Sequence, residues 1–267
     1  MITFEDCRRE LLDRGGESAL AAYQAWLDRP GYQPVHELVH GFKHDYLLRI
    51  THNELLDARA RSEHALGDVR TEEQMAEVED WTTPFAFQHL FHKYIEVERK
   101  VPTWQDFAAW LRGDAAAFFI HPLLEHVGWE TADRERRRKL KRAFRWRIGK
   151  FYLSSMRELD VFVRLRSVYG IPVRYHVLAD VLLRVDLWHG DDLVCLYFPN
   201  PKYRDQEAGR KAPAEKFFSS ASPSFCIHHV TIHRQGFGRL WVADEDSMRK
   251  LARLLEGGRH TAVNRAG

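Results

Sequence analysis

The sequence predicts a protein of mixed α and β structure, with a helical N-terminal half and a small mixed sheet in an α+β or α/β C-terminal domain. Two observations predict this arrangement. Apolar residues recur at helical spacing through most of the first half of the chain. After Gly170 the pattern changes to short runs rich in valine, isoleucine, leucine and tyrosine. We therefore expect a helical domain over 1–131 and an α/β domain over 132–267.

The composition indicates a globular chain that can bury its own core. Of the 267 residues, 45% are hydrophobic and 29% are charged, with a net charge of +2, which excludes a disordered or strongly polyionic chain. No apolar run approaches the length of about 18 residues that a membrane span needs, and the N-terminus lacks the apolar stretch of a signal peptide. Cys7, Cys195 and Cys226 are widely spaced, which predicts free thiols in a reducing cytoplasm. We expect a cytoplasmic protein without a membrane partner.

Helical segments account for the chain up to about residue 167. Gly15 and Gly16 interrupt the first apolar pattern, Pro34 opens a long helix, and Thr103 is a candidate N-cap. The expected helices cover about 4–14, 17–28, 34–66, 71–80, 84–99, a segment beginning after Thr103, 114–127 and 132–167.

Strand-like runs follow this helical region. A tight hairpin is expected at His189-Gly190-Asp191, a long loop over 199–224, and a closing amphipathic helix after the cap Asp244. The expected strands cover 171–178, 180–188, 192–199, 225–233 and 239–243.

Acidic residues accompany the first elements of this second region. Glu158 lies on the long helix, while Asp180 and Asp186 lie on the second strand-like run. Metal-dependent cleavage of nucleic acid needs two or three carboxylates to hold Mg²⁺, and a lysine or a substitute to orient the attacking water. The order of acidic helix, strand, strand with aspartate and third strand resembles the start of the PD-(D/E)xK restriction-endonuclease-like superfamily. The resemblance implies a restriction-endonuclease-like fold, a Mg²⁺ site at these three acids, and nucleic acid as the partner.

The third strand departs from the pattern of that superfamily. Ala179-Asp180 stands in the place of Pro-Asp, whereas Cys195-Leu196-Tyr197 stands in the place of acid-x-Lys. Lys202, just beyond the strand, is the candidate substitute for the lysine. The resemblance implies a divalent-metal-dependent nuclease or an inactive relative that binds nucleic acid, such as a subunit of a restriction, phage-defence or mobile-element system. The alternative is an unrelated α/β sandwich in which the aspartates are strand-end or surface residues.

The long helix begins with a basic stretch. Residues 134–150 contain ten lysines and arginines and one acid, Glu135. Cations at this density neutralise phosphates and release counterions, and a tryptophan can stack on a base or sugar. An alternative is a helix face that forms ion pairs with the acidic stretch 54–80. The candidate nucleic-acid-binding residues are Arg136, Arg137, Arg138, Lys139, Lys141, Arg142, Arg145 and Trp146.

The segment His36-Glu37-Leu38-Val39-His40 fits the H-E-x-x-H zinc motif. On a helix, His36 and His40 share one face and can hold Zn²⁺, with Glu37 as the general base. This motif predicts, as an alternative function, a zinc-dependent hydrolase or peptidase. A third interpretation is a non-enzymatic scaffold whose acidic and basic helices bind protein partners.

Overall fold

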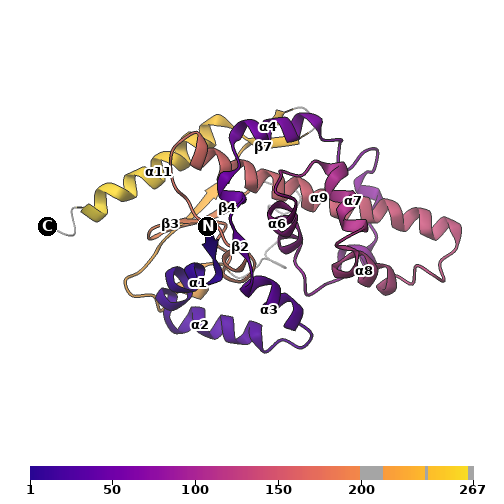
Figure 1. Ribbon diagram of the computed structural model, residues 1–267, viewed down its shortest axis with the longest axis horizontal. Coiled ribbons are helices and arrows are strands. Elements are labelled where there is room, and N and C mark those ends of the chain that lie inside the picture. Colours follow the sequence, from indigo (N-terminus) through magenta and orange to yellow (C-terminus); the bar gives the residue numbers. More distant parts are fainter. Residues whose placement is uncertain (199–212, 238–239, 264–267) are drawn as a thin grey trace. The chain divides into compact units, whose positions relative to one another are not determined.

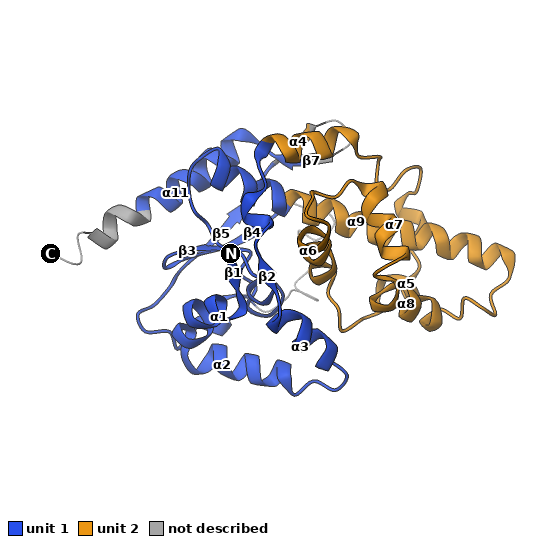
Figure 2. Ribbon diagram, viewed as in Figure 1, with its two compact units in different colours: residues 1–52, 158–235, 242–267 blue, residues 53–157, 236–241 orange. Residues whose placement is uncertain are grey.

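The computed structural model describes residues 1–198, 213–237 and 240–263 (Figure 1). The fold is mixed α+β, with helices dominant and small sheets. The chain divides into two compact units, coloured separately in Figure 2. Unit 1 comprises residues 1–52, 158–235 and 242–267, and unit 2 comprises residues 53–157 and 236–241. This division differs from the expected domains 1–131 and 132–267, because the first 52 residues cluster with the C-terminal strands.

Unit 2 is helical, and aromatic side chains fill its core. The ring of Phe107 lies 5.7 Å from that of Phe91 and 6.1 Å from that of Tyr152, and all three side chains are fully buried. Thr103 caps α7 as expected, since its side chain accepts a hydrogen bond from the backbone of Asp106. The helices associated with this unit are α4 (His52–Arg61), α5 (Ala76–Glu79), α6 (Phe87–Glu98), α7 (Trp104–Arg112), α8 (Ile120–His126) and the first part of α9 (Arg134–Ser167).

The first 52 residues of unit 1 are not helical throughout, so that expectation is wrong. A two-stranded antiparallel sheet joins β1 (Ile2–Thr3) to β2 (Lys43–His44). The single helix expected over 34–66 is replaced by α3 (Gln33–His40), β2 and α4 (His52–Arg61), because α3 ends at Gly41 and the chain then pairs with the N-terminus. The other helices here are α1 (Phe4–Cys7), a π-helical turn (Arg8–Leu12) and α2 (Asp13–Leu27), inside which Gly16 is non-helical with φ +69.

The sheet of unit 1 has the order β3-β4-β5. The strands are β3 (Leu187–His189), β4 (Asp192–Tyr197) and β5 (Cys226–Thr231). The expected hairpin is confirmed: β3 and β4 are antiparallel, and Gly190 adopts φ +60 in the turn. Strand β5 pairs parallel to β4, and the short helix α10 (Glu215–Phe218) lies between them in the chain. A parallel pair needs such a crossover connection, which the apolar patterns alone could not reveal.

The strand expected over 180–188 is wrong for most of its length. Ala179–Leu183 form a π-helical turn that buries Ala179, Leu182 and Leu183, an i, i+3, i+4 spacing that suits one helical face. Arg184 ends the turn in the left-handed conformation. Upstream, the expected strand 171–178 is reduced to one antiparallel bridge between Arg174 and Trp188.

The C-terminal end of the described chain follows the sequence expectation at β7 and α11, whereas β6 forms where no strand was expected. A two-stranded sheet joins β6 (Arg234–Phe237) to β7 (Leu240–Ala243), and α11 (Glu245–Val263) follows. Asp244 caps this helix, because its Oδ1 accepts a hydrogen bond from the backbone of Ser247 at 2.6 Å. Met248, Leu251 and Leu255 are buried on one face of α11, as the amphipathic pattern predicted.

Candidate functional site

The charges of the three acids expected at a metal site act on one buried phenol in unit 1, that of Tyr175. The hydroxyl of Tyr175 donates a hydrogen bond to Oδ2 of Asp180 at 3.0 Å. The pKa of Tyr175 is raised well above its ordinary value, first by burial and then by the negative charges of Asp180, Glu158 and Asp186. Glu158 lies on α9, Asp180 in the turn Ala179–Leu183, and Asp186 directly before β3. The charges of the three acids therefore act on a single buried group.

Asp186 is attached to strand β4 through its side chain and its backbone. Its Oδ2 accepts a hydrogen bond from the backbone of Leu196 at 2.6 Å, and its own N–H donates to the carbonyl of Val194 at 3.0 Å. These two bonds fix the carboxylate beside the centre of β4, where the sequence places Cys195-Leu196-Tyr197. A carboxylate held by a backbone donor keeps its orientation, as a metal ligand requires.

The central thiol of β4 carries no charge at neutral pH. Burial, followed by the charges of Asp186 and Glu215, raises the pKa of Cys195 to about 12. The Sγ–H group donates to the carbonyl of Arg184 at 3.2 Å. A protonated thiol supplies neither the negative charge of an acid nor the positive charge of a lysine. Lys202, the expected substitute, lies outside the described residues.

The three acids do not form a compact ligand set in the described part of the chain. In the described part of the chain, the carboxylate oxygens of Glu158, Asp180 and Asp186 do not all lie within 4.8 Å of one another. A divalent ion held by all three would therefore need its ligands to move closer or to be bridged by water, as Mg²⁺ sites commonly are.

A neutral imidazole, that of His44, lies against the same phenol. The ring of His44 is fully buried, 5.2 Å from that of Tyr175 and 5.3 Å from that of His176. Burial lowers the pKa of His44 to about 3, so this imidazole is uncharged at physiological pH. Sequence reasoning did not select His44 or Tyr175 as site residues, because their proximity depends on β2 folding back beside β1.

In unit 2, the acidic stretch 54–80 neutralises much of the basic stretch of α9. Arg142 bonds to Glu73 at 2.6 Å and to Asp68 at 3.0 Å. The other ion pairs are Arg136 to Glu77 at 2.8 Å, Lys150 to Glu79 at 3.1 Å, and, within the helix, Lys139 to Glu135 at 3.0 Å. The ion-paired helix face expected as an alternative is thus present at these positions.

Three further arginines of the same stretch donate to backbone carbonyls. Arg137 donates to the carbonyl of Trp129 at 3.0 Å, and Arg145 donates to that of Ala65 at 3.1 Å. Arg147 is buried and donates to the carbonyls of Val78 and Trp81. These guanidinium groups tie loops to α9, so they are poorly available to an external phosphate.

The remaining cations of the basic stretch are exposed. Arg134, Arg138 and Lys141 form no ion pair with any residue in the described ranges, although Lys141 lies 5.8 Å from the ring of Trp129. Trp146 is partly buried, and the ammonium of Lys150 lies 5.2 Å from its ring. The sites open to a polyanion are therefore fewer than the sequence predicted.

The histidines of the H-E-x-x-H segment already have hydrogen-bond partners on unit 1. Nε2 of His36 lies 3.1 Å from the carbonyl of Trp26, and Nε2 of His40 lies 2.7 Å from the hydroxyl of Tyr23. The two rings are 6.5 Å apart, and Glu37 accepts a hydrogen bond from Gln33. A carbonyl acceptor requires a proton on Nε2 of His36, which occupies that nitrogen's metal-binding position.

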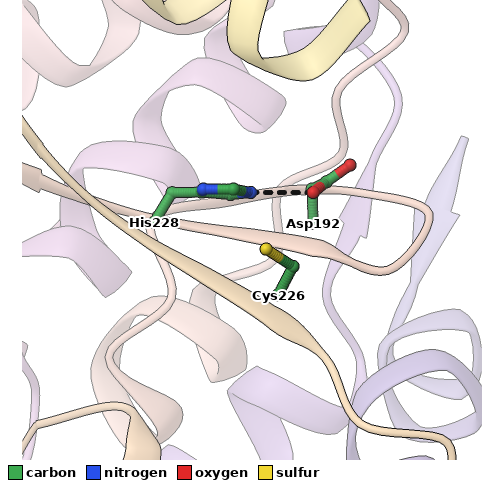
Figure 3. Close-up of side chains that lie close together, drawn as sticks. All are labelled: Asp192, Cys226 and His228. Carbon is green, nitrogen blue, oxygen red and sulfur yellow. Dashed lines mark hydrogen bonds and ion pairs between the residues drawn. The ribbon is translucent and has the colours of Figure 1, made fainter. Parts of the chain in front are cut away.

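A cluster that sequence reasoning missed joins the beginnings of β4 and β5. The ligand atoms of Asp192, Cys226 and His228 all lie within 4.8 Å of one another, and Nε2 of His228 lies 2.7 Å from Oδ1 of Asp192 (Figure 3). The alternating pair Cys226-x-His228 was visible in the sequence, because residues two apart on a strand share a face. The position of Asp192 depends on the register of β4 against β5.

Comparisons with known proteins add no relative: no protein-family model, no curated protein and no solved structure matches this chain. Among the described residues, no helix combines the length and the apolar composition required to cross a membrane.

Proposed function

We propose that this protein binds nucleic acid, and that unit 1 is a nuclease-like unit whose carboxylates Glu158, Asp180 and Asp186 hold Mg²⁺. The observation that carries the proposal is the order of elements around these acids. Helix α9 leads through the bridge at Arg174 into the antiparallel pair β3 and β4. That order keeps the acidic helix and the closing antiparallel pair of the resemblance, although its first strand is here a single bridge and the segment holding Asp180 is a helical turn.

The electrostatics of Tyr175 support a cation in this neighbourhood. The charges of Glu158, Asp180 and Asp186 all act on the buried phenol of Tyr175, and the guanidinium of Arg184 offsets part of the charge of Asp180 and Asp186. A divalent cation with oxygen ligands would add to that compensation, and Mg²⁺ accepts carboxylates together with water. The phosphate of a nucleic acid supplies the further oxygen ligands that such an ion seeks.

The chemistry of β4 favours binding over cleavage. Cys195-Leu196-Tyr197 offers a protonated thiol where a carboxylate and a lysine would be needed to activate water. We therefore assign the metal to the recognition of phosphate. In unit 2, Arg134, Arg138 and Lys141 are the cations whose charge is open to the nucleic-acid backbone.

The first test measures the affinity for fluorescently labelled duplex DNA, single-stranded DNA and RNA as a function of salt. Binding should weaken steeply with salt. Replacing Arg134, Arg138 and Lys141 by alanine should reduce the slope of log affinity against log salt by up to about 3 units. The matched control replaces Arg249, Lys250 and Arg253, three exposed cations of α11. Unchanged binding in the α9 triple variant would overturn the assignment of this surface.

The second test asks whether Mg²⁺ tightens nucleic-acid binding through the acids of unit 1. Glu158→Gln and Asp186→Asn should abolish the effect of Mg²⁺, and asparagine at 186 can still accept the hydrogen bond from Leu196. Glu256→Gln, an exposed change on α11, should leave it intact. A wild-type affinity that is the same with and without Mg²⁺ would refute the metal site. Cleavage of the labelled strands by wild type, lost in Glu158→Gln, would show an active nuclease instead.

A further inference from the structure

One face of the sheet in unit 1 presents a carboxylate, a thiol and an imidazole side by side. Asp192 is the register partner of Cys226, and His228 follows Cys226 by two residues on β5, so all three lie on the same face. Figure 3 shows the thiol of Cys226 beside the bonded pair of Asp192 and His228. The side chains of Asp192 and His228 are only 16% and 18% exposed, whereas Cys226 is exposed. Two members of the cluster, Asp192 and His228, are therefore largely buried, whereas the side chain of Cys226 is open to solvent.

We propose that Asp192, Cys226 and His228 bind Zn²⁺, with water in the fourth position. Thiolate and imidazole are ligands that select zinc over Mg²⁺ or Ca²⁺, and a carboxylate completes a common set of three. Three protein ligands and one open position define a zinc site that is accessible to a small ligand. This site is separate from the acids around Tyr175, and it shares no residue with the H-E-x-x-H segment.

The distances are compatible with a metal after small side-chain rotations. Ligand atoms at the corners of a zinc tetrahedron are separated by about 3.5 Å, given bonds of about 2.0 to 2.3 Å. The three ligand atoms lie within 4.8 Å of one another, so the longest separation must close by at most about 1.3 Å. The 2.7 Å separation between His228 and Asp192 must open by about 0.8 Å. The exposed side chain of Cys226 has room for this rotation.

Binding exchanges protons for the metal ion. The S–H bond of Cys226 breaks, an S–Zn bond forms, and the proton passes to solvent. His228 binds through a nitrogen that carries a lone pair, which is Nδ1, or Nε2 once its proton has passed through solvent to Nδ1. Asp192 exchanges its hydrogen bond with the imidazole for a bond to the ion. Zinc binding should therefore release at least one proton and weaken as the pH falls.

A catalytic thiol explains the same three residues less well. Thiol nucleophiles need a lowered pKa, because the thiolate is the reactive form. Burial and the charge of Asp192 raise the pKa of Cys226 instead. A metal ion removes this obstacle, since it stabilises the thiolate directly. The arrangement thus favours a zinc ligand over a nucleophile.

The test uses the full chain without a histidine tag, stripped of metal and titrated with Zn²⁺ against a chromophoric chelator. We expect one zinc per chain, with affinity at least about 100-fold lower in Cys226→Ser and in His228→Gln. The matched control is His229→Gln, because His229 lies on the opposite face of β5 and bonds to Glu215. Wild-type affinity in the double variant Cys226→Ser/His228→Gln would overturn the proposal. Loss of the zinc in His36→Gln or His40→Gln, with retention in the double variant, would also overturn it.

A second measurement uses the wild-type protein and does not depend on the folding of variants. Stoichiometric Zn²⁺ should slow alkylation of Cys226 by iodoacetamide at least about tenfold. Mass spectrometry of the peptide that contains Cys226 measures the rate of this reaction. Cys7 and Cys195 are buried and serve as internal references. With Co²⁺ in place of Zn²⁺, a thiolate-to-metal charge-transfer band should appear. Equal alkylation rates with and without zinc, or a cobalt spectrum without this band, would refute thiolate ligation.

Discussion

The hydroxyl of Tyr175 lies 3.0 Å from Oδ2 of Asp180, to which it donates a hydrogen bond in the interior of unit 1. The bond joins the extended segment after α9 to the helical turn Ala179–Leu183. It holds the carboxylate of one proposed metal ligand, and the charges of the other two also reach this phenol. Tyr175 is therefore a positioning residue of the proposed site, and its hydroxyl can be tested directly.

Replacing Tyr175 by phenylalanine should destabilise the protein by about 1 to 2 kcal/mol, because a part-buried hydrogen bond to a carboxylate is lost. Urea denaturation measures this free energy. The control is Tyr169→Phe, whose hydroxyl lies 3.4 Å from the exposed carboxylate of Glu245, and which should change stability by less than about 0.5 kcal/mol. Equal losses in the two variants would contradict a special role for the bond between Tyr175 and Asp180.

Elements with a local signal were predictable from the sequence. The turn at Gly190, the N-caps Thr103 and Asp244, and the strands near 192–197 and 226–231 are confirmed. In each case the signal is a residue type that the local backbone requires, such as a glycine with positive φ or a side-chain oxygen at a helix start. Such requirements do not depend on distant partners.

Elements that depend on distant partners were not predictable. Strand β2 forms because Lys43 and His44 pair with residues 2 and 3. The local sequence pattern does not distinguish this strand from a helix. The buried run at Ala179–Leu183 suits a strand or a helical turn equally well. For the sites, the sequence identified Glu158, Asp180 and Asp186 as acids but missed the cluster at Asp192, since the parallel register of β4 and β5 brings its members together.

Buried His44 should make the protein less stable in mild acid. Its pKa is about 3 in the folded state against an ordinary 6.5, so the unfolded chain binds one more proton between these values. Stability contributed by the neutral ring is complete above about pH 6.5 and is lost as the pH falls toward 3, by up to about 1.4 kcal/mol per pH unit. His44→Gln should reduce this slope in denaturation curves measured between about pH 4 and 7. The control variant His121→Gln, at an exposed histidine, should leave the slope unchanged. An unchanged slope in His44→Gln would contradict the conclusion that His44 is buried in its neutral form.

The ion pairs of Arg142 should make the stability of the protein depend on pH in a second way. Its hydrogen bonds lower the pKa of Asp68 and of Glu73, so both carboxylates stay ionised further into acid when folded. Their contribution is present above the unfolded pKa values, near 4, and is lost as the pH falls through the folded values. Arg142→Gln should therefore lower the melting temperature at pH 7 but converge with wild type in stronger acid or high salt. Arg134→Gln, which removes an exposed cation of the same helix, should have little effect at any pH.

Gly149 should tolerate no side chain, because α9 passes close to a loop of unit 2. A Cβ at this position would lie 2.8 Å from a methyl group of Leu66 and 3.1 Å from the carbonyl oxygen of Ala65. Gly149→Ala should destabilise the protein by about 1 to 3 kcal/mol from overpacking, which outweighs the gain of about 1 kcal/mol in helix propensity. The matched control is Gly257→Ala on α11, where no atom lies within 4 Å of the added group and stability should rise slightly. Thermal and urea denaturation of both variants measure whether each change raises or lowers the stability of the protein. Stabilisation by Gly149→Ala would show that the loop does not lie against the helix in solution.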